Sequence, residues 1–270
     1  MKPMFQQIYL EITNVCNLSC PFCSIDNRSK SFMSLDMIKL IITKIKGYAH
    51  GIYLHVKGEP LIHPEIVGIL QFLKEEDVNV KLTTNGTLIK ELGDVIIQMD
   101  NIHHINISLQ ASNTFTKIKK DEYFDNLFLF LNKINNTYVY LRDWVHDNDT
   151  FERLKTKYPT LKKINGYKIT DYIIYSFSEE FKWPEIDDEI VKKGPCLGGK
   201  MQLGILVNGD VVLCCLDPNG YTKVGNIIDQ SMDEILNSKL YKESISKMPY
   251  FELCKRCSFR LRFLKEEVTR

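Results

Sequence analysis

Apolar residues follow two different spacings along the chain up to about residue 157. Short runs in which every second residue is apolar indicate strands, whereas longer runs with apolar residues three or four positions apart indicate helices. A helix predicted after Ser34, a residue suited to capping, shows the second spacing. Its apolar face carries Leu35, Ile38, Ile41, Ile42 and Ile45.

The two patterns alternate regularly. Strands are predicted at 7–12, 51–56, 78–83, 103–109 and 138–142, and helices at 34–46, 64–76, 88–98, 121–134 and 149–157. Strands that alternate with helices form βα units and a parallel sheet. At about 30 residues per unit, five or six units fit into the first ~175 residues. Because that is too few for a closed eight-stranded barrel, we expect an α/β fold with a partial barrel or an open sheet.

The pattern changes after residue 195. Two apolar runs, 203–207 and 211–215, flank Asn208-Gly209 and predict a hairpin. Ser231 and Glu234 form a capping-box pattern that opens a helix to about Lys247. We therefore expect three parts, namely a core at 1–180, a connector at 181–195 and a small α+β domain with the C-terminal tail at 196–270.

Composition excludes several classes of protein. The 270 residues are 44% hydrophobic and 26% charged, with a net charge of +1. These values are ordinary for a globular protein, and a strongly basic nucleic-acid-binding surface is absent at the level of the whole chain. No apolar run reaches the roughly 18 residues of a membrane span, and the N-terminus lacks the features of a signal peptide. We expect a cytoplasmic protein with no membrane partner.

Eight cysteines fall into two groups, one near each end of the chain. They are Cys16, Cys20 and Cys23, followed by Cys196, Cys214, Cys215, Cys254 and Cys257. A reducing cytosol argues against a disulfide framework, so the grouping suggests two metal sites.

The first group has the spacing C-x3-C-x2-C and directly follows a predicted strand. Three thiolates on one loop can hold three irons of a cubane cluster and leave the fourth iron open to another ligand. The alternative is three packing or zinc-binding cysteines. Zinc prefers four nitrogen or sulfur ligands, and no fourth ligand follows nearby, so the spacing favours the iron–sulfur cluster.

With this motif the chain resembles the radical S-adenosylmethionine (SAM) superfamily, whose typical aromatic residue before the third cysteine is here Phe22. The segment Lys57-Gly58-Glu59-Pro60 resembles the family's GGEP segment, with Lys57 in place of the first glycine. The resemblance implies that this edge binds the amino group of the cofactor's methionine, and a carboxylate such as Glu59 can pair with an ammonium group. Taken alone, the segment would be read as a turn.

Further features of the family recur in order at the ends of later strands. Thr84-Asn85-Gly86 closes the third strand, although Asn85-Gly86 alone would indicate a turn. The resemblance places the ribose and carboxylate contacts of SAM at Ser108 and Gln110, of which Ser108 could be a plain strand residue. Arg142 ends the fifth strand, where it can meet a carboxylate of cofactor or substrate, and we take it as the candidate catalytic residue. The resemblance covers about residues 5–175 and implies a partial (β/α)6 barrel.

The C-terminal cysteines match a second pattern. Cys196, Gly209, Cys214 and the pair Cys254/Cys257 resemble a shortened SPASM domain, called a twitch domain. That resemblance implies one auxiliary 4Fe–4S cluster with four cysteine ligands. A structural zinc on the same thiolates is the alternative, because ligand count does not separate the two. Cys215 is either a small buried apolar residue or an alternative ligand to its neighbour.

Three weaker features stay open. Phe181, Trp183 and Pro184 either line a substrate mouth or plug the core. The six histidines show no metal-binding spacing and are read as loop and strand residues. The tail from Lys255 to Arg262, with Phe259 and Phe263 interleaved, contacts phosphates or forms a solvated face, and base rates favour the solvated face.

The resemblance implies the chemistry. A cluster on Cys16, Cys20 and Cys23 reductively cleaves SAM to a 5′-deoxyadenosyl radical, which removes a hydrogen from the substrate. An auxiliary cluster with four cysteine ligands then accepts an electron, and the result is net oxidation. The implied partners are SAM, a reductant such as flavodoxin or ferredoxin, and a small-molecule, tRNA or peptide substrate.

Three functions follow from these features. The first is oxidation of a small-molecule or nucleoside-borne amine or alcohol, one version being trimming of a wobble-uridine side chain in tRNA. The second is crosslinking or epimerisation of a ribosomally made peptide. A zinc-binding scaffold without catalysis is the third, and the first cysteine motif argues against it.

Overall fold

The computed structural model describes residues 4–144, 147–177 and 182–262. The chain forms two compact units. A terminal unit combines residues 1–15, 22–58 and 181–270, and a central unit combines residues 16–21 and 59–180. Each unit is described separately.

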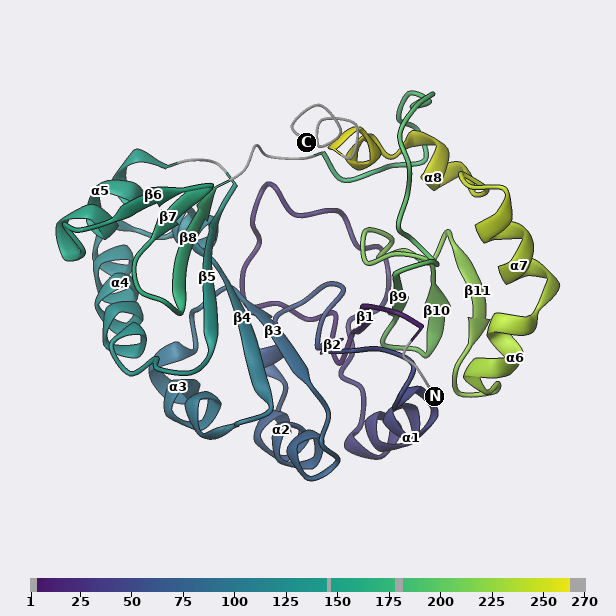
Figure 1. Cartoon of the computed structure of the whole chain (residues 1–270), viewed down its shortest axis with the longest axis horizontal. Helices are drawn as coiled ribbons and strands as arrows, with labels where there is room; N and C mark the ends of the chain where they lie inside the picture. The colour runs from purple at the N-terminus through teal and green to yellow at the C-terminus, as the bar shows by residue number, and fades with distance from the viewer. Residues whose placement is uncertain (1–3, 145–146, 178–181, 263–270) are drawn as a thin grey trace. The chain divides into compact units, whose positions relative to one another are not determined.

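The sheet of the terminal unit unites distant parts of the sequence. Its strands are β1 (Gln7–Leu10), β2 (Ile52–Tyr53), β9 (Gln202–Ile205), β10 (Asp210–Val212) and β11 (Lys223–Asn226), in the order β11-β10-β9-β1-β2. β1 is parallel to both β2 and β9, while β10 is antiparallel to β9 and β11 (Figure 1). The predicted hairpin around Asn208-Gly209 is confirmed as β9 and β10. β11 was not predicted.

The helices of the terminal unit begin at capping side chains. In α1 (Leu35–Ile45), the hydroxyl of Ser34 accepts a hydrogen bond from the Met37 N–H, as predicted. The capping box at Ser231 and Glu234 is present and opens α6 (Met232–Asn237). The prediction of a single helix up to about Lys247 is wrong. Ser238 has an extended backbone, and its side chain caps a second helix, α7 (Lys239–Ser246). A short helix, α8 (Glu252–Arg256), follows.

The central unit contains the regular βα repeat. Its parallel strands β3 (Val80–Thr84), β4 (Ile102–Ser108), β5 (Tyr138–Asp143) and β8 (Ile173–Phe177) lie in that order. Helices α2 (Ile66–Glu75), α3 (Ile89–Gln98), α4 (Lys117–Leu131) and α5 (Asn148–Lys157) lie along the same side of these strands in Figure 1. Two short antiparallel strands, β7 (Gly166–Lys168) and β6 (Lys162–Ile164), extend the sheet beyond β8 and were not predicted.

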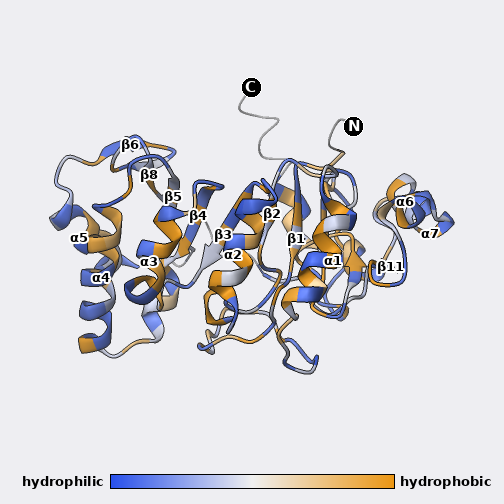
Figure 2. Ribbon diagram, turned by 90° about the horizontal axis from the view of Figure 1, so that it is seen from below, coloured by the Kyte–Doolittle hydropathy of each residue, from blue (hydrophilic) through white to orange (hydrophobic). Residues whose placement is uncertain are grey.

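Alternation within the strands assigns one apolar face to the core. Ile105 and Ile107 of β4 and Val139 and Leu141 of β5 are buried, whereas the residues between them are polar. Helices α1, α2 and α3 are amphipathic in the same way, whereas α4 buries Phe124 and Leu127 but leaves Leu129 exposed. Figure 2 shows hydrophobic and hydrophilic residues combined in each of α1 to α4. Burial of these faces is the main favourable term in folding, at about 25 cal/mol per Å² of apolar surface.

The predicted fold class is confirmed. Parallel strands alternate with helices up to β8, and a smaller region with antiparallel strands and short helices follows. The domain boundaries at 180 and 196 stay a prediction. Because β9 pairs with β1, residues before position 180 and residues after position 196 lie in the same compact unit. In the described residues, no helix combines the length and the apolar character that crossing a membrane requires.

A buried carboxylate ties the terminal unit together. Glu11, which directly follows β1, is 0% exposed and accepts hydrogen bonds from both terminal nitrogens of Arg28, at 2.6 and 2.8 Å. It also accepts the N–H of Lys57 at 3.1 Å and the N–H of Val207 at 2.9 Å. Burial raises the pKa of the Glu11 carboxyl, and the Arg28 guanidinium opposes that rise. One side chain therefore fixes three loops next to β1.

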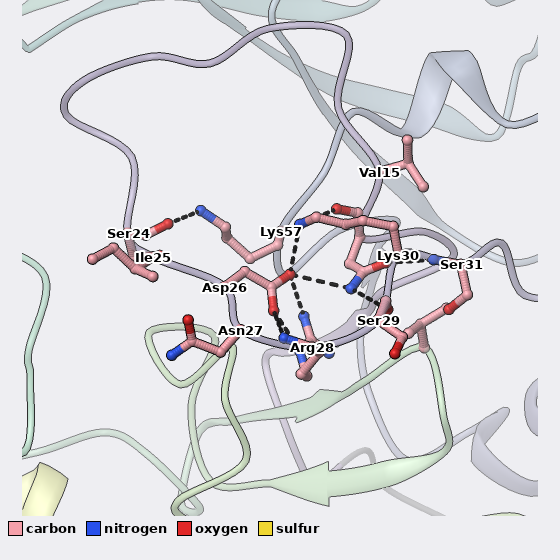
Figure 3. Close-up of polar contacts among 12 residues, drawn as sticks. Val15, Ser24, Ile25, Asp26, Asn27, Arg28, Ser29, Lys30, Ser31 and Lys57 are labelled. Atoms are coloured by element: carbon pink, nitrogen blue, oxygen red, sulfur yellow. Dashed lines mark hydrogen bonds and ion pairs between the residues drawn. The ribbon is translucent and has the colours of Figure 1, made fainter.

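The loop after the first cysteines is held by a second carboxylate. Asp26 accepts the Nε–H of Arg28 at 2.9 Å, the Lys30 ammonium at 3.1 Å and the amide of Asn14 at 3.1 Å. Figure 3 shows Arg28 and Asp26 turned toward each other within this loop. Arg28 therefore bridges two carboxylates, of which Glu11 is the more deeply buried.

We predict that Arg28→Met lowers the free energy of unfolding by about 3–5 kcal/mol, because it leaves a buried carboxylate uncompensated. Lys30→Met is the matched control: Lys30 pairs with the same Asp26, but its side chain is 53% exposed, so its loss costs less than about 1 kcal/mol. Urea denaturation measures both values. Equal losses in the two variants would contradict the central role of the Glu11–Arg28 pair.

Candidate functional site

The first cysteine group lies on the loop after β1 and is unusually accessible. Cys16 and Cys23 are exposed and Cys20 is half-buried. Free cysteines are among the most buried residue types, so this exposure fits thiols that hold a ligand. Cys23 belongs to the terminal unit, whereas Cys16 and Cys20 belong to the central unit.

In the terminal unit, Cys23 has a lysine beside its sulfur. The ammonium nitrogen of Lys57 lies 2.9 Å from Cys23 Sγ and donates to the Ser24 carbonyl at 2.6 Å. Figure 3 shows the Lys57 side chain directed at Ser24. The Trp183 indole donates to the Phe22 carbonyl at 3.1 Å, and Lys57 Nζ lies 5.8 Å from the indole centre. Trp183 thus secures the cysteine loop, while Phe181 lies outside the described residues.

Gly58 is required by close packing. Its φ is +76°, and an added Cβ would lie 2.5 Å from the Thr13 carbonyl and 2.6 Å from the Val15 carbonyl. Only glycine tolerates both conditions. The turn that carries Lys57 is therefore pressed against the chain that leads into the cysteine loop.

In the central unit, the start of the loop is fixed to the end of β3. Asn85 Nδ2 donates to Asn17 Oδ1 at 2.9 Å and lies 3.8 Å from Cys16 Sγ, and Asn17 Nδ2 donates to Thr87 at 2.8 Å. Asn85, predicted as a cofactor contact, therefore supports the residue next to Cys16. A cavity of about 590 Å³ opens beside this loop; it is lined in part by Asn17, Leu18 and Ser19.

Glu59 is a buried carboxylate held by three donors. It accepts the Leu61 N–H at 3.1 Å, the Thr84 hydroxyl at 2.8 Å and the Asn85 N–H at 2.6 Å. Burial raises the pKa of Glu59 to about 7, against the effect of these hydrogen bonds. Pro60 occupies the first position of a 3-10 turn, Pro60–Ile62, and is buried. The structure thus joins Glu59 to Thr84 and Asn85, and an ammonium ligand would favour its ionised form.

The residues after β4 include an acceptor without a partner. Ser108 ends β4, whereas Gln110 lies in the 3-10 turn that follows, Leu109–Thr114, rather than on the strand as predicted. The Gln110 side-chain oxygen is buried and has no hydrogen-bond partner among the described residues. A buried acceptor of this kind fits a polar ligand.

A polar row crosses the face of the central sheet that carries Ser108. Strand register places Ser108 beside Arg142, and Arg142 beside Ser176. The Arg142 guanidinium carbon lies 5.3 Å from the centre of the Trp144 ring. The predicted catalytic residue Arg142 is therefore adjacent to a predicted cofactor contact.

The row continues toward the other end of the strands with residues that were not predicted as site residues. His104 stacks on Tyr140 at 4.7 Å between ring centres, its Nε2 is 3.0 Å from Asn106 Oδ1, and Asn106 donates to Thr83 at 3.2 Å. Burial, and after it the charges of Lys81 and Arg142, lower the pKa of His104. The period-two placement of His104, Asn106 and Ser108 was the signal in the sequence that could have identified this row.

The second cysteine group converges. Burial and, after it, the nearby thiols of Cys196, Cys214 and Cys257 together raise the pKa of Cys254 to about 12. Burial likewise raises the pKa of Cys257 to about 11, together with Cys214 and Cys196. Neighbouring thiolates repel one another, so four thiols this close do not ionise together easily. A bound metal centre offsets this repulsion, because its positive charge stabilises the deprotonated thiols.

Donors surround these sulfurs. Cys196 Sγ accepts the Gly198 N–H at 3.4 Å, and Cys214 Sγ accepts the Gln202 side-chain amide at 3.1 Å. Hydrogen bonds of this kind are what orient and tune thiolate ligands. Within the described residues, no group of three or more His, Cys, Asp or Glu side chains is placed to hold a single metal ion.

The basic tail has a structural role at this site. Arg260 is 5% exposed and donates to the carbonyls of Gly194, Val191 and Cys254. Neither phosphate contact nor a solvated face, the two predicted roles, applies to Arg260. Lys255 and Arg256 pair with Glu252, and Phe263 lies outside the described residues.

Cys215 has two polar neighbours: besides Tyr9 it forms a hydrogen bond with Cys214, and this bond, followed by burial, raises the pKa of Cys214. Cys215 forms its other hydrogen bond with the Tyr9 hydroxyl, and burial followed by the Cys215 charge raises the pKa of Tyr9. Tyr9 stacks on Tyr53 at 4.8 Å and accepts a hydrogen bond from Gln7. Cys215 therefore contacts both the assigned ligand Cys214 and the aromatic pair of Tyr9 and Tyr53 in the terminal unit.

Comparison with protein families agrees with this arrangement. Residues 10–156 match the model of the Radical SAM superfamily, which is more than half of the chain, and residues 196–258 match SPASM, an iron-sulfur cluster-binding domain. The chain belongs to the radical SAM superfamily. Each of the two domains implies a 4Fe–4S cluster, so the zinc alternative for the C-terminal cysteines is not supported.

Curated relatives match only part of this radical SAM chain. A probable GTP 3',8-cyclase of Methanocaldococcus jannaschii is 27% identical over 121 residues, which are 43% of this chain and 40% of the relative. The chain thus matches less than half the length of that relative.

Solved structures match over nearly the whole chain at low identity. BtrN, solved in complex with AdoMet (SAM) and 2-DOIA, is 16% identical with a TM-score of 0.63, over 96% of this chain and 94% of BtrN. SuiB of Streptococcus suis, bound to S-adenosylmethionine, is 16% identical with a TM-score of 0.63, over 95% of this chain and 72% of SuiB. These likenesses show the radical SAM fold.

We predict that Glu59 makes stability depend on pH. Its pKa of about 7 lies above the ordinary 4.5, so the folded chain binds the proton more tightly than the unfolded chain does. Stability therefore falls by up to roughly 3 kcal/mol as pH rises from about 4.5 to 7. In Glu59→Gln this component is lost, so its thermal midpoint without SAM falls less between about pH 5 and 8. Parallel pH profiles of wild type and variant would show that Glu59 does not titrate in this range.

Proposed function

We propose that this radical SAM enzyme oxidises an amine or alcohol of a small polar molecule or of a nucleoside. The observation that carries the proposal is the second cysteine group. A Cβ at Gly198 would lie 3.4 Å from Cys196 Sγ and 3.6 Å from Cys214 Cβ. The thiols of Cys196, Cys214 and Cys257 are near enough to Cys254 to raise its pKa. Four cysteines satisfy a 4Fe–4S cluster and leave no iron open for substrate. Such a centre is suited to accepting an electron.

The first cysteine group has a different task. Cys16, Cys20 and Cys23 are assigned as the ligands of the other cluster, and three ligands leave one iron for SAM. When bound, this cluster and SAM supply a 5′-deoxyadenosyl radical that removes a hydrogen atom from the substrate. Phe22 and Gly58 shape the loops around the cluster, and the chain's other residues bind and orient the cofactor.

The cofactor contacts are assigned to the ends of the strands. Glu59, supported by Thr84 and Asn85, is assigned to the amino group of SAM, because a buried carboxylate lowers its energy by pairing with an ammonium. Pro60 starts the turn that buries Glu59. Ser108 and Gln110 are assigned to the ribose and carboxylate of the cofactor. Arg142, the candidate catalytic residue, is assigned to a carboxylate of the cofactor or of the substrate.

The polar row of the central unit supports a polar substrate. Thr83, His104, Asn106 and Tyr140 offer donors and acceptors rather than an apolar surface. A nucleoside-borne amine, such as the side chain of a wobble uridine in tRNA, is one substrate of this chemical class. The relative from Methanocaldococcus jannaschii is named as a probable cyclase of GTP, which is itself a nucleotide.

The proposed reaction needs an external source of electrons. A low-potential carrier such as flavodoxin or ferredoxin is the class of partner that reduces a cluster with three cysteine ligands before SAM cleavage. The eight cysteines, none of them in a disulfide in the described residues, fit a reducing cytoplasm.

We predict that Cys20→Ala abolishes the release of 5′-deoxyadenosine from SAM, measured by chromatography under anaerobic reduction. Cys257→Ala retains part of that release but loses about four irons per chain, because only the auxiliary site is damaged.

Cys215→Ala is the matched control for the auxiliary site, since it removes the thiol next to Cys214 without removing an assigned ligand. It is expected to keep the full iron content. Loss of about four irons in Cys215→Ala, with full iron in Cys214→Ala, would show that the ligand assignment is wrong.

A further inference from the structure

A lysine stands where the family's segment begins with glycine, and its side chain reaches a sulfur of the first cysteine group. We propose that Lys57 is a positioning residue: it fixes the Cys23 thiolate and raises the reduction potential of the cluster on Cys16, Cys20 and Cys23. The inference rests on the proposed function, because it takes Cys23 as a cluster ligand.

The ammonium group of Lys57 makes two short contacts. Lys57 Nζ lies 2.9 Å from Cys23 Sγ and 2.6 Å from the carbonyl of Ser24, so one ammonium group holds both the ligand and the next peptide. Ionised donors make stronger hydrogen bonds than neutral ones. Lys57 is only 9% exposed, so solvent screens its charge little.

Neighbouring groups restrain the position of Lys57. Its N–H is bound by Glu11 at 3.1 Å, and the next residue, Gly58, is packed against the carbonyls of Thr13 and Val15. Trp183 lies alongside, 5.8 Å from ring centre to Nζ, while its own N–H is bound to Phe22. The backbone and the side chain of Lys57 are thus held at both ends.

A fixed cation beside a ligand sulfur changes the redox equilibrium. Reduction adds one negative charge to the cluster, and a nearby positive charge stabilises the reduced form more than the oxidised form. Hydrogen bonds to the sulfurs and net charge are among the factors that set Fe–S potentials. Lys57 therefore raises the potential of the first cluster and makes its reduction easier.

The auxiliary site offers an internal contrast. There a neutral side chain donates to a cysteine, since the Gln202 amide donates to Cys214 Sγ at 3.1 Å. The two cysteine groups thus differ in the charge of the donor, and substitutions at Lys57 and Gln202 are expected to act on different clusters.

The test is a potentiometric titration of the full chain, anaerobically reconstituted with iron and sulfide and followed by electron paramagnetic resonance. SAM is omitted, so that a role in cofactor binding cannot produce the signal. Wild type is compared with Lys57→Met, Lys57→Gln, Lys57→Arg and Gln202→Leu. A variant with Cys16, Cys20 and Cys23 all changed to Ala gives the signal of the auxiliary cluster alone.

In Lys57→Met, the ratio of oxidised to reduced first cluster at the wild-type midpoint is expected to rise at least tenfold, a downward shift of about 59 mV for a one-electron couple. Lys57→Arg keeps the charge and stays near wild type, and Lys57→Gln lies between. The auxiliary midpoint moves only in Gln202→Leu.

An unchanged reduction midpoint of the first cluster in Lys57→Met overturns the inference. If SAM affinity falls while that midpoint stays unchanged, Lys57 is a cofactor contact and the inference is overturned as well. Iron content separates this from failure of the proposed function: about eight irons per chain in wild type and variant show that both clusters are bound. Loss of the first cluster in Lys57→Met with retention in Lys57→Arg supports the positioning role. A wild type that binds no cluster on Cys16, Cys20 and Cys23 overturns both proposals.

Discussion

Glu11 is a carboxylate with no exposure to water, and the terminal unit is arranged around the donors that compensate it. Arg28 supplies two of them from the far side of the cysteine loop, and the N–H groups of Lys57 and Val207 supply the others. A buried charge without such partners would cost several kcal/mol. The loop after Cys23, the turn before Gly58 and the hairpin of β9 and β10 are therefore fixed to the end of β1 by a single side chain. This constraint adds to the backbone pairing of β1 with β9, which places the C-terminal strands in one sheet with the first strand.

The hydrogen bonds of Glu11 also affect the first cysteine group. Because Glu11 holds the backbone of Lys57, the ammonium of Lys57 can be directed at Cys23, and Trp183 closes the other side. In the central unit a second buried carboxylate, Glu59, organises the end of β3 through Thr84 and Asn85, and Asn85 in turn supports the start of the cysteine loop. Structural and functional roles thus meet in the same few polar side chains. Substitutions there are expected to change stability and cofactor binding together.

Much of the fold was predictable from periodicity, since each strand from β1 to β5 and each helix from α1 to α5 shows its spacing in the sequence. The caps at Ser34 and Ser231 were predictable too, because capping is a local property. β6, β7, β8 and β11 were missed. β6, β7 and β11 are three or four residues long and contain glycine or lysine, which carry little strand signal, whereas β8 (Ile173–Phe177) was overlooked although its residues favour a strand. The pairing of β1 with β9 and the contact between Lys57 and Cys23 join residues far apart in sequence, so no local pattern reports them. Cysteine spacing, by contrast, predicted the candidate ligands, while the row around His104 was overlooked although its alternation was visible.

The central claim is that two cysteine groups hold two iron–sulfur clusters with different tasks. The most direct test measures iron and acid-labile sulfide per chain, with Mössbauer spectra, on the anaerobically reconstituted protein and on a variant with Cys16, Cys20 and Cys23 all changed to Ala. About eight irons falling to about four is the predicted result. About four irons falling to none, with one zinc bound in both proteins, would contradict it, because the C-terminal thiolates would then be structural and the oxidation would lack its electron acceptor.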